Sequence, residues 1–331
     1  MNAIISMAIA ALIWSLYPLA AVEGMDTMSG FSLVVVSTFF AAIGSIVLLI
    51  FYFPSGTKIK TIIDHQKTLS RSSYINIFAS GAAHLLCHGL FFTALSLSHK
   101  GGASLIYESW PIIALIMTPL MIKKDWQAVG LHEFITAVIA MAGVMIIVFS
   151  NDKIELPFGS SKDLNARVDY SVLLGYILAF VGGYACAMNI IFKAMVAQEY
   201  KPIANTMGVT IISEFYSRLV GLALVIILYP FLSGYIDLSN IAWIPAAFIG
   251  IVVMVLGGAI YTYSILNARS PTIHVMYYMV PVFAVLFLWM AGETTITTGL
   301  FVGGAIIISC NIYLYFAAKK TSKQNRENAV K

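Results

Sequence analysis

The sequence predicts an all-α membrane protein with ten transmembrane helices, and three observations lead to that prediction. Of its 331 residues, 60% are hydrophobic and 10% are charged, whereas soluble domains average about 25% charged residues. Ten apolar windows reach the length of about 20 residues that a helix needs to cross the hydrocarbon core. The basic residues collect in alternate loops between these windows. With a mean hydropathy of +0.89, the chain is suited to a bilayer rather than to water.

The ten windows follow one another along the chain and leave short loops between them. Each is expected to be helical, because every backbone polar group in a bilayer core needs a partner within the protein. In chain order the windows are Asn2–Val22, Gly30–Phe53, Ser72–Ser98, Gly101–Ile122, Trp126–Ser150, Tyr170–Phe192, Pro202–Leu232, Ile241–Asn267, Ser270–Gly292 and Thr294–Ala318.

The basic residues give the orientation, because cytoplasmic loops of membrane proteins are enriched in Lys and Arg. With the N-terminus in the cytoplasm, fourteen of the nineteen basic residues fall in inside loops, four fall in outside loops, and Arg218 lies within a span. The fourteen are Lys58, Lys60, Lys67, Arg71, Lys123, Lys124, Lys193, Lys201, Arg269, Lys319, Lys320, Lys323, Arg326 and Lys331, against Lys100, Lys153, Lys162 and Arg167 outside. This bias predicts an even number of spans with both termini in the cytoplasm.

A shift of about 170 residues aligns three features of the first half with the second. It carries Trp14 onto Tyr184, Tyr107 onto Tyr277 and Pro111 onto Pro281, although chance in an apolar chain is the alternative explanation. The predicted organisation is one repeat over 1–150, an external linker over 151–169, a second repeat over 170–318, and a basic cytoplasmic tail over 319–331. Five spans in each half would invert the second half relative to the first, as in many secondary transporters.

Several stretches resemble the EamA-type, ten-helix members of the drug/metabolite transporter superfamily. They are Ala11-Leu12-Ile13-Trp14, Ala94–Lys124, Ser264–Glu293 with Met279-Val280-Pro281-Val282, and the Gly-rich last window from Thr298. The resemblance implies two five-helix bundles around a central cavity, with the fifth and tenth helices at the periphery.

The segment Glu108-Ser109-Trp110-Pro111 is similar to the Tyr-x-Trp-Pro segment of the aromatic amino acid exporters in that superfamily. Here the tyrosine position holds Glu108, and a tyrosine stands one residue earlier, at Tyr107. This departure favours a cationic or proton-coupled solute over an aromatic amino acid.

Glu108 is the first candidate for solute binding and coupling. It lies about seven residues into the fourth window, where an ionisable side chain costs about 2.5–3.5 kcal/mol to insert and usually faces a cavity or a partner. A carboxyl group beside aromatic rings can hold a cation and exchange a proton. The alternative is a packing hydrogen bond to a neighbouring helix. We expect the cavity to be lined by Trp14, Tyr107, Glu108, Trp110, Tyr184 and Tyr277.

Two further pairs are candidates for coupling or gating. Glu214 and Arg218 stand four residues apart on one helix face, where they can neutralise each other or form a gate. His84 and His88 have the same spacing and are expected to be hydrogen-bonded histidines or, less simply, a proton relay. No third ligand at a clear spacing accompanies them, and the three cysteines lack CxxC spacing, so we expect neither a metal site nor a disulfide.

Prolines are expected to kink three spans. Pro18, Pro111 and Pro281 each deprive the carbonyl four residues earlier of its helical donor, and these carbonyls belong to Trp14, Tyr107 and Tyr277. Kinks that serve only the shape of the bundle are the alternative. In the last window, Gly299-x-x-x-Gly303 could pack two helices together or form a homodimer.

These features together predict a secondary transporter of the cell (inner) membrane, and not an enzyme. It would move a small metabolite, either an amino acid-like zwitterion or an amine, by alternating access, driven by the solute gradient or by protons. No cofactor and no nucleic acid partner are expected, and the chain has no P-loop sequence. The alternative is an intramembrane metal-dependent enzyme that acts on a lipid-like substrate through His84, His88 and a carboxylate.

Overall fold

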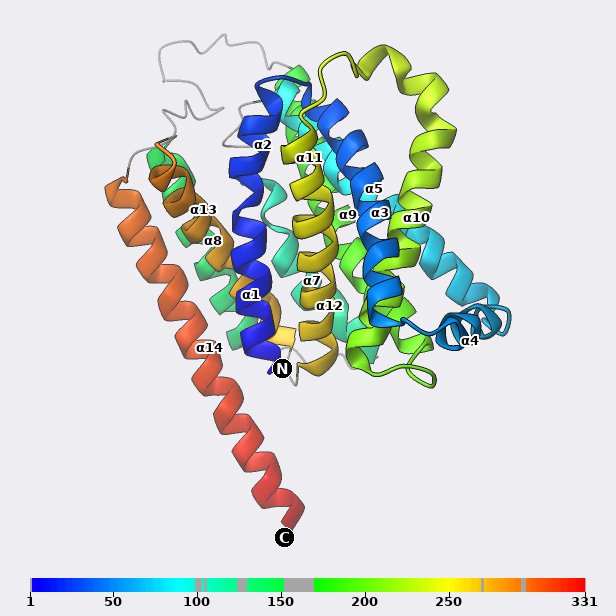
Figure 1. Cartoon of the computed structure of the whole chain (residues 1–331). Helices are drawn as coiled ribbons and strands as arrows, with labels where there is room; N and C mark the ends of the chain where they lie inside the picture. The colour runs from blue at the N-terminus through cyan, green and yellow to red at the C-terminus, as the bar shows by residue number, and fades with distance from the viewer. Residues whose placement is uncertain are drawn as a thin grey trace, which may run out of the picture.

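The computed structural model describes residues 2–98, 103, 106–123, 130–151, 170–268, 271–292 and 296–330, and helices are the sole regular structure among them (Figure 1). The elements are α1 (Ala3–Ser15), α2 (Tyr17–Met25), α3 (Gly30–Tyr52), α4 (Gly56–Gln66), α5 (Arg71–Leu97), α7 (Trp110–Thr118), the π-helix η1 (Pro119–Lys123), α8 (Leu131–Asn151), α9 (Tyr170–Glu199), α10 (Thr206–Leu232), the 3₁₀-helix η3 (Ser233–Tyr235), α11 (Trp243–Ala247), the π-helix η4 (Phe248–Gly257), α12 (Gly258–Asn267), the 3₁₀-helix η5 (Pro271–Tyr278), α13 (Met279–Met290) and α14 (Thr298–Val330). The predicted all-α class is confirmed.

Among the residues that the structure describes, seven helical stretches are long and apolar enough to cross a membrane. They are Ala3–Met25, Gly30–Tyr52, Arg71–Ala94, Tyr170–Glu199, Thr206–Tyr235, Trp243–Asn267 and Ile273–Met290. Three shorter apolar helices, Trp110–Ile122, Leu131–Ile147 and Thr298–Leu314, lie in the fourth, fifth and tenth predicted windows. A multi-pass membrane protein is therefore shown, whereas the count of ten spans and the inverted repeat stay predictions.

Helix α9 corrects one part of the orientation argument. It continues to Glu199, seven residues beyond the predicted end of its window at Phe192. Lys193 therefore lies inside the helix with 1% of its surface exposed, and not in a cytoplasmic loop. It must be removed from the fourteen inside residues, although the bias of the remaining basic residues is still strong.

Two other boundaries were also not as expected. Helix α4 occupies a stretch that we had predicted as a loop, and the backbone of the predicted tail over 319–331 continues α14 as far as Val330. Of the predicted linker over 151–169, Asn151 is the last residue of α8, and residues 152–169 lie outside the described residues. So do Lys100, Lys124, Arg269, Glu293, Thr294 and Lys331.

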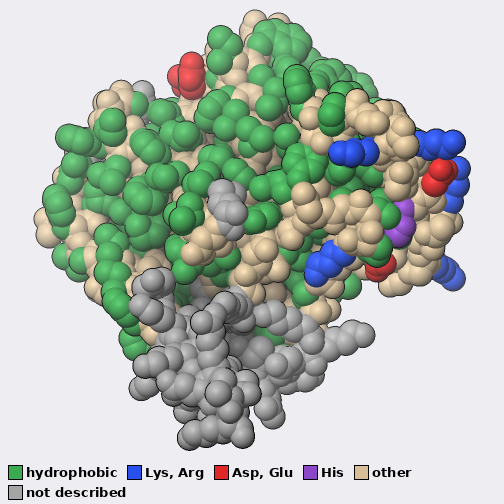
Figure 2. Space-filling view, turned by 60° about the horizontal axis from the view of Figure 1, so that its bottom comes forward, with side chains coloured by type: hydrophobic (Ala, Val, Ile, Leu, Met, Phe, Trp, Pro, Cys, Tyr) green, Lys and Arg blue, Asp and Glu red, His purple; other side chains and the backbone are tan. Residues whose placement is uncertain are grey.

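Helix α4 packs beside the end of α9 at the side of the molecule where both chain termini lie (Figure 1). His65 contacts the Glu199 carbonyl oxygen at 2.9 Å, and the Tyr200 hydroxyl donates to the Gln66 side chain. Ile62 is buried beneath the helix, whereas its lysines are exposed. Figure 2 shows Lys and Arg side chains gathered on the side where α4 lies, next to a largely hydrophobic surface.

Side-chain caps fix where three of the long helices begin. Ser29 and Ser70 each accept a hydrogen bond from the backbone N–H three residues later, at 3.1 and 3.2 Å. Asn205 does the same for α10, where its side-chain oxygen accepts from Gly208 N at 2.9 Å and from the Tyr52 hydroxyl at 2.7 Å. Such caps satisfy donors that the first helical turn would otherwise leave free. They set the register of α10, which carries much of the site described below.

Glycines let neighbouring helices approach to backbone contact. A Cβ atom at Gly303 of α14 would lie 2.3 Å from the Gly143 carbonyl oxygen of α8, so these two helices pair closely. This contact places the predicted fifth and tenth spans side by side and uses Gly303 within the chain, so that glycine does not support a homodimer. A Cβ atom at Gly182 of α9 would lie 3.3 Å from the Cys87 carbonyl oxygen of α5.

Candidate functional site

Four aromatic side chains from four segments meet in the middle of the bundle. Trp14 of α1 stacks on Tyr261 of α12 with ring centroids 4.8 Å apart, and Tyr277 of η5 lies 5.2 Å from Trp14 and 4.3 Å from Trp110 of α7. We call Trp14, Trp110, Tyr261 and Tyr277 the aromatic cluster. Trp110 and Tyr261 are fully buried, Tyr277 is 8% exposed, and Trp14 is partly exposed. The structure thus brings three of the predicted cavity residues together and adds Tyr261.

The π-helix η4 anchors this cluster. Its wider turns shift backbone acceptors out of the regular α-helical pattern. The Val253 carbonyl accepts a hydrogen bond from Trp14 Nε1 at 2.9 Å. A Cβ atom at Gly257, the last residue of η4, would lie 2.5 Å from the same indole nitrogen. Trp14 is thus held by an acceptor on one residue of η4 and by the absence of a side chain on another.

Tyr107 and Glu108 stand at a helix break that leads into α7. The Phe91 ring packs on Tyr107 with centroids 4.3 Å apart, and Tyr107 is buried. The Tyr107 carbonyl, which Pro111 leaves without its helical donor, rests against Gly183 of α9, where a Cβ atom would come within 2.7 Å. The freed carbonyl therefore faces a glycine backbone in the neighbouring helix.

The carboxyl group of Glu108 is the least satisfied acid of this region. Its Oε2 atom is buried and has no hydrogen-bond partner among the described residues. The carboxyl group lies within electrostatic range of Tyr277, Tyr278 and Cys186. A buried carboxyl oxygen without a donor is costly, and a bound cation or a proton would relieve that cost. The packing alternative would require a donor for this oxygen, and the described residues provide none.

Tyr184, the sixth predicted cavity residue, is placed differently. It lies on α9 with 43% of its surface exposed, and it makes no ring contact with the aromatic cluster. The repeat that pairs it with Trp14 therefore does not give the two residues the same surroundings in this structure.

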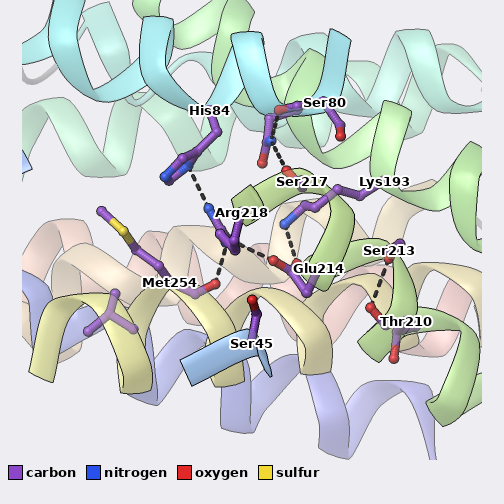
Figure 3. Close-up of polar contacts among 12 residues, drawn as sticks. Ser45, Ser80, His84, Lys193, Thr210, Ser213, Glu214, Ser217, Arg218 and Met254 are labelled. Atoms are coloured by element: carbon purple, nitrogen blue, oxygen red, sulfur yellow. Dashed lines mark hydrogen bonds and ion pairs between the residues drawn. The ribbon is translucent and has the colours of Figure 1, made fainter. Parts of the chain in front are cut away.

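Glu214 of α10 holds two cations. Its Oε1 atom pairs with Lys193 of α9, and its Oε2 atom lies 2.7 Å from Arg218 Nη2. Their side chains are 0–3% exposed. We call Lys193, Glu214, Arg218 and His84 the ionic centre (Figure 3). The predicted pair of Glu214 and Arg218 does form, but it belongs to a larger group that includes Lys193.

Arg218 connects α10 to two other helices. Its Nη1 atom donates to His84 Nδ1 of α5 at 2.6 Å, and its Nη2 atom also donates to the Met254 carbonyl of η4 at 2.6 Å. The Met254 carbonyl of η4 thus accepts a hydrogen bond from Arg218, and the carbonyl of its neighbour, Val253, accepts one from Trp14. Nearby, Asn189 of α9 donates to the Ser80 carbonyl of α5 at 2.6 Å. Because these bonds cross several helices, the ionic centre is coupled to how those helices pack.

A second group of side chains extends from His84 along α5. One ligand atom each from His84, Cys87 and His88 lies within 4.8 Å of the others. The sequence prediction overlooked this His-x-x-Cys-His spacing, which places three metal-binding residue types on one helix face. The thiol of Cys186 on α9 also lies within hydrogen-bonding reach of Cys87.

The protonation of His84 argues against a metal at this group. A guanidinium only donates hydrogen bonds, so His84 Nδ1 must accept from Arg218. A neutral imidazole with an accepting Nδ1 carries its hydrogen on Nε2, and that nitrogen then has no lone pair for a metal ion. The intramembrane enzyme alternative would need His84 as a ligand, and this hydrogen bond does not fit that role.

The three prolines lie in the first turns of helices that follow a break. Pro18 is the second residue of α2, Pro111 is the second residue of α7, and Pro281 is the third residue of α13, which follows η5. In each case the interruption lies next to a member of the aromatic cluster or to Tyr107. Helix breaks at membrane depth are tolerated where they are buried in protein or line a cavity.

Comparison with known proteins agrees with this architecture. Residues 1–149 match the profile of the EamA-like transporter family. An uncharacterized transporter, sll1164 of Synechocystis sp., is 22% identical over 239 residues, and the matched region covers 72% of this chain and 64% of that relative. A solved crystal structure that shares 14% identity superposes with a TM-score of 0.69 over 96% of this chain and 98% of its own, which shows a shared fold. The first half of the chain is thus similar to the EamA-like transporter family, and the chain spans a little under two thirds of the length of its transporter relative.

Proposed function

We propose that the chain is a secondary transporter that moves an amino acid-like zwitterion or an amine across the cell inner membrane by alternating access. The EamA-like match and the transporter relative support transport of a small solute through the membrane. The buried aromatic cluster and Glu108 support the choice of solute. Aromatic faces and a carboxylate are the groups that bind ammonium ions.

The single observation that carries this choice is the unpartnered Glu108 Oε2 atom beside Tyr277. Among the described residues, this buried oxygen has no hydrogen-bond donor. An ammonium group of the solute would provide donors and a compensating charge. A proton would satisfy the same group in the absence of solute, so proton and solute would compete for one carboxylate. Competition of this kind is a physical basis for proton-coupled exchange.

We further propose ten spans in two inverted five-helix repeats, with both termini in the cytoplasm. Both termini lie on the side of α4, where exposed lysines gather, and cytoplasmic surfaces are enriched in such residues. Tyr107 and Tyr277, which the repeat pairs, both stand just before helices that begin near a proline, α7 and α13. Solute sites of inverted-repeat transporters lie between the two halves.

In this scheme the structure is an occluded state. Trp110 is fully buried and Tyr277 nearly so, which means that a solute reaches the cluster only after α1 moves relative to α7 and η5. The ionic centre joins α5, α9, α10 and η4. It would resist this motion while its ion pairs are intact and permit it when they break. Glu214 and Arg218 are therefore gating candidates. His84 is coupled to them through Arg218, and His88 lies one turn further along α5.

A thermal-shift screen of the purified protein tests the proposal. Amino acids, amines and quaternary ammonium compounds should raise the melting temperature, because a ligand that binds only the folded state stabilises it by about 2.7 kcal/mol at 100 times its Kd. Sugar phosphates should not, since Glu108 would repel them. Tight binding of a phosphorylated metabolite, with no response to amines, would contradict the proposal. Stoichiometric zinc in the same preparation would instead favour the enzyme alternative.

A further inference from the structure

By formal charge, the ionic centre contains one more cation than anion. Glu214 is shared by Lys193 and Arg218, whose side chains are at most 3% exposed, and His84 is a neutral acceptor towards Arg218. Glu108 lies within electrostatic range of Cys186 and Tyr277. An uncompensated buried charge is costly, because a single carboxylate cannot neutralise two cations in a low dielectric.

The hydrogen bonds of the centre are also incomplete. Arg218 Nε is buried and lacks an acceptor among the described residues, although both terminal nitrogens of the same guanidinium are bonded. Thr262 Oγ1 on α12 is likewise buried without a partner in the described part of the chain. Thr262 stands one helical turn after Gly258, the residue that contacts Glu214 and Lys193, so both face the ionic centre.

At Gly258, the backbone of α12 lies directly against the ionic centre. A Cβ atom there would lie 2.6 Å from Glu214 Oε1 and 3.1 Å from Lys193 Nζ. Any side chain would displace the ion pair, so the position next to the two cations is kept clear of protein side chains from α12. The backbone of α12 therefore packs directly against the ion pair, and the excess formal positive charge with the unbonded Arg218 Nε donor suits a small anionic group.

We infer that the ionic centre binds the carboxylate of the transported solute, through Lys193 and Arg218, while the ammonium group of the same solute binds at Glu108. This inference rests on the proposed function and narrows its substrate class from zwitterions or amines to amino acid-like zwitterions. Charge-assisted hydrogen bonds to Arg and Lys are among the strongest that a carboxylate makes. The solute would complete two half-sites. Its ammonium group would supply a positive charge at Glu108, and its carboxylate would supply a negative charge at the ionic centre.

The two half-sites are linked along α9. Cys186 lies within electrostatic range of both Glu108 and Lys193, and it stands seven residues before Lys193 on the same helix face. Two turns of helix separate these residues by roughly 10 Å along the axis. A solute that bridges the half-sites therefore places its two charges towards opposite ends of this stretch. The geometry favours amino acids whose ammonium and carboxylate groups can be far apart.

A set of three related probes tests the inference. L-phenylalanine carries both charges, phenethylamine lacks the carboxylate, and 3-phenylpropanoate lacks the amine. L-lysine and cadaverine form a second pair for the longer charge separation. Binding is measured by calorimetry on the protein in lipid nanodiscs, in a chloride-free buffer. L-lysine should bind at least about tenfold more tightly than cadaverine, as expected for a charge-assisted bond, and the advantage of L-phenylalanine over phenethylamine should be smaller.

Lys193→Met supplies the decisive comparison. It removes the excess charge and leaves Glu214 and Arg218 as a balanced pair, so the variant should fold and still bind the amines. Its advantage for the carboxylate-bearing probe should disappear. The matched control is Lys201→Met, because Lys201 is exposed eight residues further along the chain. This control should keep the tenfold difference.

Each other outcome has a distinct meaning. Equal binding of amino acid and amine to the wild type would overturn the carboxylate site and leave the proposed function standing. Binding of 3-phenylpropanoate without binding of either amine would overturn the Glu108 part of the proposed function and keep the carboxylate site. Binding of none of the probes would overturn both. If added chloride stabilised the solute-free protein and abolished the amino acid advantage, the anion would be inorganic, and the inference would be wrong.

Discussion

Gly257 and Gly258 are neighbours in the chain, yet they make room for two different groups. A Cβ atom at Gly257 would meet the Trp14 indole nitrogen at 2.5 Å, whereas one at Gly258 would meet Glu214 Oε1 at 2.6 Å. The junction of η4 and α12 therefore lies between the aromatic cluster and the ionic centre and contacts both. A movement of this junction would change the two sites together, which is the kind of link that alternating access requires.

The two glycines can be separated by substitution. Gly257→Ala should disturb the surroundings of Trp14 and change the intrinsic tryptophan fluorescence, while Gly258→Ala should leave the fluorescence nearly unchanged and weaken binding of amino acids. Both should lower the free energy of unfolding by about 1–3 kcal/mol, the usual cost of overpacking. Gly234→Ala is the control, because a Cβ atom there has nothing within 4 Å. Identical effects of the first two variants would show that the sites are not distinct.

Glu108→Gln should abolish transport while the protein still reaches the membrane in normal amounts. The amide keeps the shape of the side chain, but it has no charge and cannot take up a proton. Uptake into proteoliposomes, measured at several pH values, should fall to background, and any residual binding should no longer vary with pH. Glu199→Gln, at an exposed position, should behave like the wild type. Transport by Glu108→Gln with an unchanged pH profile would return this residue to a packing role.

Glu214→Gln should be the most destabilising change in the ionic centre. It leaves Lys193 and Arg218 buried without a counter-charge, and breaking a buried ion pair in this way costs about 3–5 kcal/mol. Lys193→Met, which leaves a balanced pair, should unfold within about 1 kcal/mol of the wild type. The double variant should therefore be more stable than Glu214→Gln alone. Thermal unfolding in detergent provides the comparison, and a double variant less stable than either single one would contradict it.

The contact of α8 with α14 can be tested at two adjacent glycines. Gly303→Ala should destabilise the protein by about 1–3 kcal/mol, because the new methyl group would lie 2.3 Å from a backbone oxygen that cannot move freely. Gly304→Ala should be nearly neutral, since its nearest neighbour would be Val282 at 3.6 Å. The difference in melting temperature between the two variants is the measurement. Equal melting temperatures would mean that the two helices do not pack at Gly303.

Cysteine labelling tests the orientation. In a background without the native cysteines, residues introduced at Ser55 and Ser322 should be shielded in intact cells from an impermeant thiol reagent. One introduced at Ser160 should react. The expectation follows from the excess of Lys and Arg in the loops assigned to the cytoplasm. Labelling of the first two positions and protection of the third would reverse the proposed topology.

The sequence predicted most of the helices, because a hydrophobic run of spanning length has few alternative structures in a bilayer. It also located Trp14, Trp110 and Tyr277, since prolines next to aromatic residues mark helix breaks. It placed Lys193 wrongly because the apolar run stops at Phe192, and the partner of that lysine is on another helix, 21 residues further along. It missed Tyr261, because nothing nearby distinguishes it from other aromatic residues in the span. The π-helix η4 has no propensity signal at all, although Val253 and Met254 within it accept bonds from both sites.

The burial of Lys193 has a consequence for how the protein enters the membrane. A lone lysine in a span costs about 2.5–3.5 kcal/mol to insert, and the same holds for each charge of α10. Helices α9 and α10 are joined by six residues, so Lys193 can meet Glu214 as soon as the second helix leaves the ribosome. Biogenesis should therefore favour insertion of α9 and α10 as one hairpin. A chain that stops after α9 would present an unmatched lysine to the translocon.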